Sequence, residues 1–534
     1  MSKDTTKVIN ELKEKALQYH SHKQPGKFAT RILKPLTSLE HFGLSYTPGV
    51  AEPCMAIHEN PASAYQFTSK GNVVAVISNG TAVLGLGDIG PLASKPVMEG
   101  KAILFKYLAG IDSIDVEIDL KDTNKIVEFI KAMVPTVGGI NLEDVAAPEC
   151  FDIDKAVHYE LGIPFFHDDQ SGTAVVVIAA VGSALAYNKK KLSDCKIVVS
   201  GAGAAALACI DLLVEIGADI KKFHVFDSKG LLHTGRELDR HKRKYAQPSD
   251  SSMREALNQA DIFLGLSRGN VLSKDDVAQM VDDPILFAMA NPIPEILPTD
   301  AKEVKPNAIV GSGRSDFVNQ VNNVLCFPFL FRGALDVKAK TITLNMQLAC
   351  AQAIMQVAQS DPEFGKDKVM PYTFDPSLLY IVPKAVAQAA IDDKVAQSRL
   401  PDDYNDFLDS LVYGSVIDKS CCIPAIGNDA ANQLVKILKA HNITRVSDKK
   451  LFALSKEEIL DRARDVKSCV VVFEDMDVGF NVESAIMTKD LIKTLATAKN
   501  NLLGLILDGE LLFDSSNRIW HAHKLSRGKN ERAE

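Results

Sequence analysis

Short apolar runs alternate with longer helical patterns along most of the chain. The runs that predict buried strands occupy residues 72–78, 111–118, 163–166, 197–199, 223–226, 261–265 and 285–290. Patterns with helical periodicity follow at residues 95–110, 124–133 and 207–216, and a long apolar helix is predicted from Thr173. Strands that alternate with helices in this way are typical of α/β domains built on mostly parallel sheets.

A chain of 534 residues is too long for one hydrophobic core. We expect an N-terminal parallel-sheet domain over residues 1–175, a second α/β domain with a helical return over 176–400, and a small α/β module over 401–534. The module is predicted to hold helices at 401–411, 429–440 and 489–499, strands at 469–473 and 502–507, and a hairpin turn at 514–517. Its acidic segment 474–477 is either a metal or effector site or a solvated strand end.

The composition is that of an ordinary soluble globular protein, with 46% hydrophobic and 24% charged residues. A net charge of -8 gives no reason to expect a nucleic acid partner. No apolar run reaches membrane-spanning length, and residues 5–20 form a charged amphipathic helix without a signal-peptide core. The nine cysteines are scattered through apolar runs, which favours reduced, buried thiols. We therefore expect a cytoplasmic protein that binds neither nucleic acid nor a membrane.

A glycine-rich turn follows the predicted strand at residues 197–199. Gly201, Gly203 and Ala206 form a G-x-G-x-x-A pattern that opens a helical pattern. Such a turn lets the backbone approach a pyrophosphate, and the helix N-terminus offers unpaired N–H groups to it. The next strand ends at Asp227, at the spacing where a carboxylate meets an adenosine ribose. These features predict a dinucleotide site, although a tight packing turn would show the same glycines.

The residues after this strand leave the choice of dinucleotide open. Asp227 favours NAD, because a carboxylate accepts hydrogen bonds from the ribose hydroxyls. Ser228, Lys229 and the basic segment 240–244, which ends in Lys244, could instead hold the 2'-phosphate of NADP. A solvated helix face is the alternative interpretation of the basic segment.

Two carboxylate pairs stand where buried strands are predicted to end. Glu143-Asp144 follows one apolar run, and Asp168-Asp169 follows the strand at 163–166. Like charges brought together at strand ends repel each other and are costly to desolvate unless a cation holds them. Carboxylate oxygens suit a hard divalent metal, so the two pairs predict a metal site. Each pair alone would more often be a helix N-cap.

Four other residues are candidates for chemistry. Lys101 lies early in the helix predicted over 95–110, where the dipole favours the neutral amine. Desolvation near a metal would lower its pKa toward that of a general base. Tyr46, in a loop before a proline, is either a packing residue or a catalytic one. Asn291 and Asn323 are candidates to bind a small carboxylate, or else turn residues.

Several motifs together resemble those of malic enzyme, specifically of the short bacterial type. They are Tyr46-Thr47-Pro48-Gly49-Val50, LGLGDIG from Leu84, Glu99-Gly100-Lys101, Asn141-Leu142-Glu143-Asp144, HDDQSGTA from His167, SGAGAAA from Ser200, Ala290-Asn291-Pro292 and QVNNVLCFPFLFRGALDV from Gln320. In this order they cover about residues 25–400. The resemblance implies an N-terminal catalytic domain, a Rossmann-type NAD(P)-binding domain, and metal-dependent oxidative decarboxylation of L-malate to pyruvate and CO2.

The resemblance also implies roles for the residues that carry the chemistry. Lys101 would be the general base, with Asp168 hydrogen-bonded to it, and Tyr46 would be the general acid. The ligands of Mg2+ or Mn2+ would be Glu143, Asp144 and Asp169.

The resemblance extends to the substrate and the nucleotide. Asn291 and Asn323 would contact malate, and Ser228 and Lys244 tilt the expected nucleotide toward NADP. The nucleotide would be held by Gly201, Gly203 and Asp227. A homodimer or higher homo-oligomer is expected from the resemblance alone.

The chain departs from the family pattern in two places. Ser171 stands between the HDDQ block and Gly172-Thr173, where it tunes the site or removes a supporting contact. Residues 401–534 are too short for the phosphotransacetylase-like domain of many long bacterial members, and they carry no motif of it. Two alternatives stay open: another metal-dependent 2-hydroxyacid oxidative decarboxylase, and a nucleotide-binding regulatory protein without turnover.

Overall fold

The computed structural model describes residues 13–21, 26–30, 32–34, 36–83 and 86–412, and the strands at 422–424, 469–473, 502–507 and 510–514. The chain divides into two compact units, residues 1–402 and 403–534. Part of the predicted N-terminal helix is present, as a helix over residues 13–21. The helices predicted at 429–440 and 489–499 and the acidic segment 474–477 lie outside the described residues.

The first sheet of the larger unit has four parallel strands in the order β2-β1-β3-β4. The strands are β1 (Val73–Ser78), β2 (Asp112–Glu117), β3 (Gly139–Leu142) and β4 (Phe165–His167), with the connecting helices α5 (Pro91–Ala109), α6 (Thr123–Met133) and α7 (Glu149–Val157). Residues of α6 and α7 pack in one cluster with β1, β3 and β4. Helix α5 contacts β1 and β2. Strands β1, β3 and β4 are buried, as is usual in a parallel sheet, whereas the edge strand β2 is mostly half-buried.

The second sheet has six strands in the order β10-β9-β8-β5-β6-β7, and only the β6–β7 pair is antiparallel. The strands are β5 (Ile197–Ser200), β6 (Phe223–Asp227), β7 (Gly230–Leu231), β8 (Ile262–Gly265), β9 (Ile285–Ala288) and β10 (Ile309–Ser312). Its helices are α9 (Ala204–Glu215), α10 (Met253–Leu257), α11 (Lys274–Ala278) and α12 (Pro298–Val304). The strand order reverses between β5 and β8, which is where such a sheet binds its ligand.

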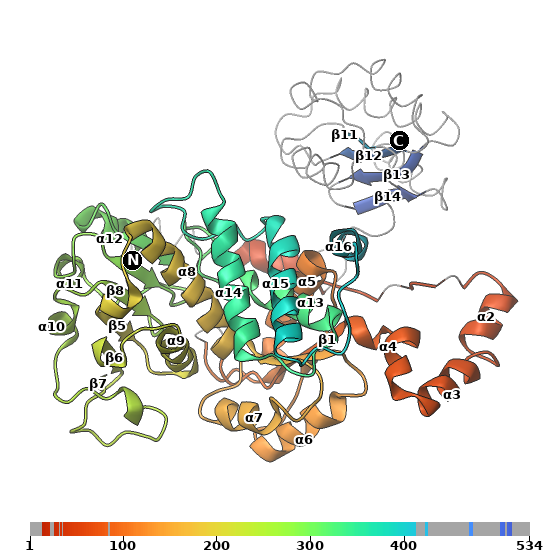
Figure 1. Cartoon of the computed structure of the whole chain (residues 1–534), viewed down its shortest axis with the longest axis horizontal. Helices are drawn as coiled ribbons and strands as arrows, with labels where there is room; N and C mark the ends of the chain where they lie inside the picture. Colours follow the sequence, from red (N-terminus) through yellow and green to blue (C-terminus); the bar gives the residue numbers. More distant parts are fainter. Residues whose placement is uncertain are drawn as a thin grey trace. The chain divides into compact units, whose positions relative to one another are not determined.

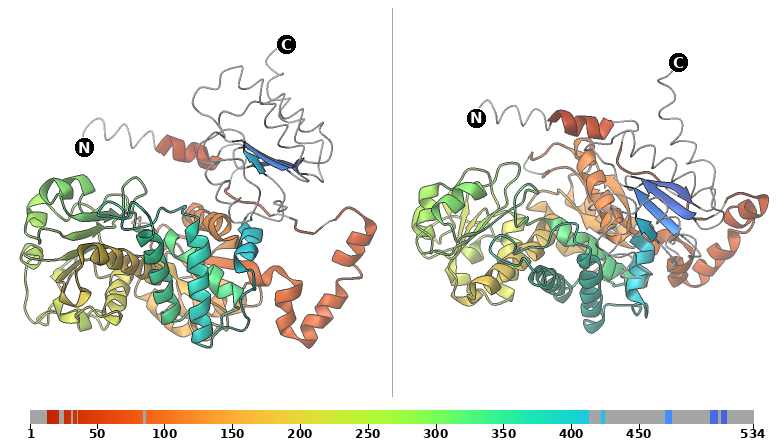
Figure 2. Two further views of the ribbon diagram at one scale, coloured as in Figure 1. Left: turned by 45° about the horizontal axis from the view of Figure 1, so that its top comes forward. Right: turned by 90° about the horizontal axis from the view of Figure 1, so that it is seen from above.

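A layer of long helices joins the two sheets (Figures 1 and 2). Its members are α8 (Thr173–Asn188), α13 (Phe327–Asp336), α14 (Leu344–Gln359) and α15 (Ser377–Asp392). Helix α8 packs against α9 and α14, and α13 packs against α5 and α15.

Helix α8 corrects one expectation from the sequence. We expected no apolar run of membrane-spanning length. The helical stretch Asp168–Asn188 is nevertheless long and apolar enough to cross a membrane, by length and composition alone. However, 67% of its most apolar window is buried inside the protein. A mostly buried helix of this composition is accounted for as a core helix of the joining layer.

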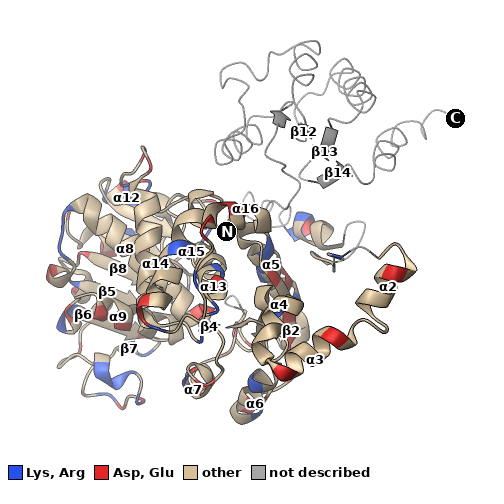
Figure 3. Cartoon of the chain, turned by 45° about the vertical axis from the view of Figure 1, so that its right-hand side comes forward, with Lys and Arg blue, Asp and Glu red and all other residues tan. Residues whose placement is uncertain are grey.

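The N-terminal segment is mostly exposed. It contains α2 (Leu39–Ser45), α3 (Ala51–Glu59) and α4 (Ala64–Phe67), none of which buries a residue. In Figure 3 the ribbons of α2 and α3 are mostly tan, the colour of residues other than Lys, Arg, Asp and Glu. Exposed helices with few charges leave apolar side chains in contact with water, and these are candidates to be covered by a partner.

The smaller unit, described by itself, begins with α16 (Tyr404–Val412) and has a four-stranded sheet in the order β11-β12-β13-β14. The strands are β11 (Cys422–Pro424), β12 (Cys469–Phe473), β13 (Leu502–Leu507) and β14 (Glu510–Asp514). The strands predicted at 469–473 and 502–507 are confirmed. Strand β13 pairs antiparallel with β14, and the hairpin turn predicted at 514–517 lies, beyond Asp514 at the end of β14, outside the described residues.

Candidate active site

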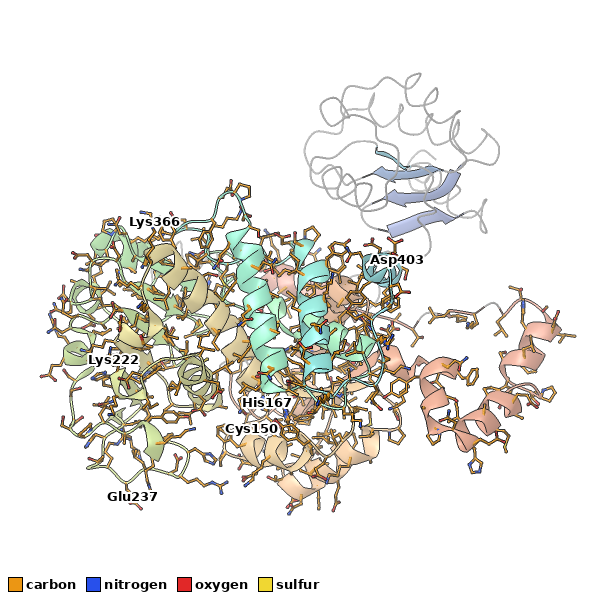
Figure 4. The ribbon with its side chains drawn as sticks, viewed as in Figure 1. Cys150, His167, Lys222, Glu237, Lys366 and Asp403 are labelled. Atoms are coloured by element: carbon orange, nitrogen blue, oxygen red, sulfur yellow. The ribbon has the colours of Figure 1, made fainter. Side chains whose placement is uncertain are left out.

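The two carboxylate pairs lie at one edge of the first sheet. In the parallel register Leu142 pairs with His167, so Glu143 and Asp168 are the first residues beyond two adjacent strand ends. Both of these carboxyl groups are buried. Figure 4 labels His167, the last residue of β4. Sheet pairing therefore brings together side chains that are far apart in the sequence.

The three predicted metal ligands lie close together. One carboxylate oxygen from each of Glu143, Asp144 and Asp169 lies within 4.8 Å of the others. The backbone N–H of Asp144 donates to Asp169 Oδ2 (2.7 Å), and Asp144 has a left-handed backbone with φ 52°. Such a positive φ is uncommon outside glycine, so the turn after β3 is specialised for this arrangement.

The electrostatics of the three carboxylates suit a cation. Burial raises the pKa of Glu143 well above its usual value, Lys101 opposes this, and Asp169 and Asp168 add to it. Oxygen donors of like charge that are removed from water fit a hard divalent ion such as Mg2+ or Mn2+. A cation there would offset their mutual repulsion.

Lys101 lies between the metal candidates and Asp168. Its ammonium Nζ donates to Glu143 Oε1 and to Asp168 Oδ2, both at 2.5 Å. The ammonium also lies 4.5 Å from the centroid of the Phe327 ring. The aromatic face and two carboxylates orient one positive group at the strand ends. The hydrogen bond that the family resemblance implied between Lys101 and Asp168 is present.

One detail of the prediction for Lys101 is wrong, and the lowered pKa, which was expected only near a bound metal, stays a prediction. Helix α5 begins at Pro91 and not at Lys95, so Lys101 lies in the middle of the helix and not near its positive end. Burial lowers the pKa of Lys101, but Asp168, Glu143 and Asp169 outweigh burial and leave the pKa above its usual value. A positive charge that offsets these carboxylates would be needed to lower the pKa of Lys101 below its usual value.

Asp168 and Asn323 form the other side of the site. Asp168 is 0% exposed, and its Oδ2 accepts from Asn323 Nδ2 (2.9 Å) as well as from Lys101. Its Oδ1 is buried without a hydrogen-bond partner. A Cβ on Gly172 would come within 1.9 Å of this Oδ1, so only glycine fits there. Thr173 donates to Asn323 Oδ1 (3.1 Å), which fixes the asparagine beside the carboxylates.

Two predicted site residues stand apart from this cluster. Asn291 follows β9, is exposed, and donates only weakly to Met289 O (3.4 Å). Tyr46 follows α2, is 68% exposed, and has its ring 6.0 Å from that of Phe42. Among the described contacts, neither residue touches Lys101 or the carboxylates.

The glycine turn lies where the strand order of the second sheet reverses. Gly201 has φ 120°, and a Cβ there would lie 2.3 Å from Leu266 O, so the turn requires glycine. Gly203 precedes α9, and Ala206 is buried in its first turn. Helix α9 packs against the turn Asp168–Gly172. The N–H groups that a pyrophosphate would use therefore lie next to the carboxylate cluster.

Asp227 is engaged by positive groups. It accepts from the backbone N–H of Lys229 (2.9 Å) and from Arg236 Nη2 at both carboxylate oxygens (2.9 Å each), and Lys242 Nζ lies 3.6 Å away. Burial raises the pKa of Asp227, but the Lys229 N–H and Arg236 outweigh it and lower the pKa. Asp227 is therefore a paired carboxylate and less able to accept from ribose hydroxyls.

Lys244 and Ser228 lie on the surface near this group. Lys244 Nζ pairs with Asp211 Oδ2 at 2.8 Å and lies over the ring of Tyr245. Ser228 is exposed. An exposed ion pair such as that of Lys244 contributes little to stability, so the lysine can exchange Asp211 for another anion.

Two contributors to these sites were not predicted. Arg236 lies nine residues beyond Asp227 and its pairing depends on the β6–β7 hairpin. Phe327 belongs to an apolar run typical of a core helix, and nothing in that run indicates an ammonium partner. The only local sign of the pairing between Arg236 and Asp227 is the β6–β7 hairpin, because Gly230 follows Asp227 closely enough for a turn.

Comparison with known proteins agrees with the arrangement of the two sheets. The family model described as "Malic enzyme, N-terminal domain" matches residues 25–158, and "Malic enzyme, NAD binding domain" matches residues 170–388. A crystal structure of malic enzyme from Pyrococcus horikoshii matches with a TM-score of 0.71 and 38% identity, over 80% of this chain and 99% of that one.

Two curated relatives differ in length. An NAD-dependent malic enzyme of Rhizobium meliloti (strain 1021) is 46% identical over 444 residues, which is 80% of this chain and 58% of the relative. An NADP-dependent malic enzyme of Halomonas elongata is 46% identical over 407 residues, which is 73% of this chain and 96% of the relative. The chain spans about half the length of the longer relatives, between 55% and 58%. The chain covers 96% of the Halomonas elongata relative at 46% identity, so it belongs to the malic enzyme family.

Proposed function

We propose that this chain catalyses the metal-dependent oxidative decarboxylation of L-malate to pyruvate and CO2, with NAD+ or NADP+ as the hydride acceptor. The observation that carries the proposal is the position of Lys101, held between Glu143 and Asp168 beside the three-carboxylate cluster. The packing of α9 on the Asp168–Gly172 turn supports a nucleotide next to that cluster.

The residues of the chain account for each proton in this reaction. A divalent ion held by Glu143, Asp144 and Asp169 would supply an electrophile for the C2 oxygen of malate, and the nicotinamide would accept the hydride. Lys101 takes the proton of the C2 hydroxyl as hydride leaves C2. The C4 carboxylate is then lost as CO2, which leaves the enolate of pyruvate, and Tyr46 protonates C3 of this enolate to give pyruvate.

Two of the carboxylates that raise the pKa of Lys101, Glu143 and Asp169, would also hold the cation. Cation binding therefore weakens their hold on the lysine proton and favours the neutral amine that a general base needs. Asp168 keeps the Lys101 Nζ in place through this change, since it is not among the three clustered ligands.

An initial-rate comparison tests the proposed function. Reduction of NAD+ or NADP+ should require both malate and Mn2+, and chelation of the metal should lower the rate about 100-fold or more. Lactate lacks the C4 carboxylate, so a catalyst specific for malate should leave it unreacted. Equal rates with other 2-hydroxyacids would favour the broader decarboxylase, and nucleotide binding without any turnover would favour the regulatory alternative.

We further propose a preference for NADP. The pairing of Asp227 with Arg236, with Lys242 close by, turns an acidic strand end into a locally positive one that suits a 2'-phosphate. Lys244 adds a positive side chain whose ion-pair partner is the exposed Asp211.

The Lys244→Ala variant tests this preference. We expect the KM for NADP+ to rise about tenfold and the KM for NAD+ to change much less, because only NADP carries the phosphate. Lys222, at the opposite end of β6, donates to Ser193 O, so Lys222→Ala is the matched control. Equal changes for both nucleotides in Lys244→Ala would show that the preference was misassigned.

A homodimer in which Tyr46 serves the site of the second copy completes the proposal. Tyr46 stands apart from the carboxylate cluster, and the segment that carries it exposes large apolar side chains: Ile32, Leu33, Leu36, Leu39, Phe42 and Leu44. Exposed apolar surface of this kind marks a protein contact. A second copy that covers the segment would bury these side chains and could bring Tyr46 to a Lys101 site.

A further inference from the structure

Glu295 is a fully buried carboxylate in the second sheet domain, at 0% exposure. Its Oε1 accepts from the backbone N–H of Ser267 (3.0 Å), and its Oε2 accepts from the backbone N–H of Ala290 (3.0 Å). Ser267 follows β8 and Ala290 follows β9. One carboxylate therefore holds together the ends of two adjacent strands at the edge where the nucleotide would bind.

The contact extends to the strand before the glycine turn. The hydroxyl of Ser267 lies 2.8 Å from that of Ser200, the last residue of β5. The backbone N–H of Leu266 also donates to Ser200 O (2.7 Å). Glu295, Ser267 and Ser200 thus link the exits of β5, β8 and β9 in one hydrogen-bonded network.

The chain leaves a space for this carboxylate. A Cβ on Gly265, the last residue of β8, would lie 2.4 Å from Glu295 Cδ. Burial raises the pKa of Glu295, while the N–H groups of Ser267 and Ala290 oppose this. Among the described residues, no lysine or arginine forms an ion pair with it. A buried acid without a countercharge is costly, so a carboxylate at this place needs an explanation beyond packing.

We propose that Glu295 is a positioning residue that sets Asn291 and the nucleotide-facing ends of β5 and β8. Ala290, which Glu295 binds through its N–H, is the residue directly before Asn291. The side chain of Asn291 is exposed and can contact a ligand. Its position along the chain is held by the hydrogen bond from the N–H of Ala290 to Glu295. The inference rests on the proposed function and adds a group that acts on malate and nucleotide through other residues.

The Glu295→Gln variant tests the proposal, because its amide nitrogen would face an N–H donor and lose one hydrogen bond. We expect the Kd for NADPH, followed by nucleotide fluorescence, and the KM for malate each to rise about tenfold. The Mn2+ concentration for half-maximal rate should stay unchanged, because the metal candidates belong to the other sheet. Glu303 is exposed and pairs with Lys274, so Glu303→Gln should change none of these values.

Two outcomes would overturn the inference. Wild-type values in Glu295→Gln would show that the network has no influence on the site, and a parallel loss of Mn2+ affinity would show general damage. If Glu295→Gln does not fold, Ser267→Ala removes the hydroxyl that links to Ser200 and donates to Glu295 Oε1 (3.4 Å), but keeps the backbone N–H bond to Glu295. It should raise the Kd for NADPH about threefold. An unchanged Kd in Ser267→Ala would then refute the proposal. NADPH binding needs no turnover, so these results are separate from a failure of the proposed function.

Discussion

The Lys101→Ala variant is expected to lose about 10³-fold in kcat for malate oxidation, because no group remains to take the proton of the C2 hydroxyl. Lys106 lies on the same helix, with 55% of its side chain exposed and a surface pair to Asp112. Lys106→Ala should therefore keep the wild-type rate. Steady-state rates at saturating Mn2+ and nucleotide measure both variants. Equal activity of Lys101→Ala and the wild type would remove Lys101 from the mechanism.

Lys101→Arg separates the charge of this lysine from its ability to give up a proton. Arginine keeps a positive group between Glu143 and Asp168 but stays protonated at all working pH values. We expect Lys101→Arg to be as inactive as Lys101→Ala but to melt near the wild-type Tm. Lys101→Ala leaves two buried carboxylates without their ammonium, so its Tm should fall and should recover in part with Mn2+. An active Lys101→Arg would show that charge alone is required.

Two inactive variants are expected to restore activity when they are combined in one dimer. Tyr46→Phe lacks the proton donor and Lys101→Ala lacks the base, so each alone should be nearly inactive. If Tyr46 serves the second copy, a mixed dimer has one site with both residues intact and one site with neither. Random pairing makes half of the dimers mixed, so co-expression should return about one quarter of the wild-type sites. Active-site titration or kcat per chain measures this fraction.

The control for this mixing experiment uses two residues from the same site. Lys101 and Asp168 contact each other within one chain. Co-expression of Lys101→Ala with Asp168→Asn therefore creates no complete site and should stay inactive. Light scattering should give the mass of two chains. A monomer, or a Tyr46→Phe and Lys101→Ala mixture that stays inactive, would contradict the shared site.

The carboxylate cluster could be predicted from the sequence because it depends on local elements. Glu143 and Asp168 each follow an apolar run directly, and parallel strands place such residues at one edge of a sheet. The start of helix α5 was predicted at Lys95 instead of Pro91, although proline is a typical first helical residue. Pro96 lies inside this helix, and a proline in a helical pattern usually indicates that a helix boundary is near.

Contacts between distant segments could not be predicted. The pKa of Lys101 depends on how closely α5 brings its Nζ to Glu143 and Asp168, and no local pattern encodes that distance. The pairing of Lys244 with Asp211 joins residues 33 positions apart. Glu295 stands in a proline-rich segment of the sequence, and only the folded sheet shows that its carboxylate holds two strand ends.

Helix α8 continues without a break from the turn that carries Asp168 and Asp169 toward the second sheet. One residue inserted into this helix would rotate the turn that carries Asp168 and Asp169 by about 100°. It would also shift this turn by about 1.5 Å relative to the glycine turn of the second sheet. Exchanges among valine, isoleucine and alanine alter only local volume. Selection on this segment should therefore act on its residue count more strictly than on its composition.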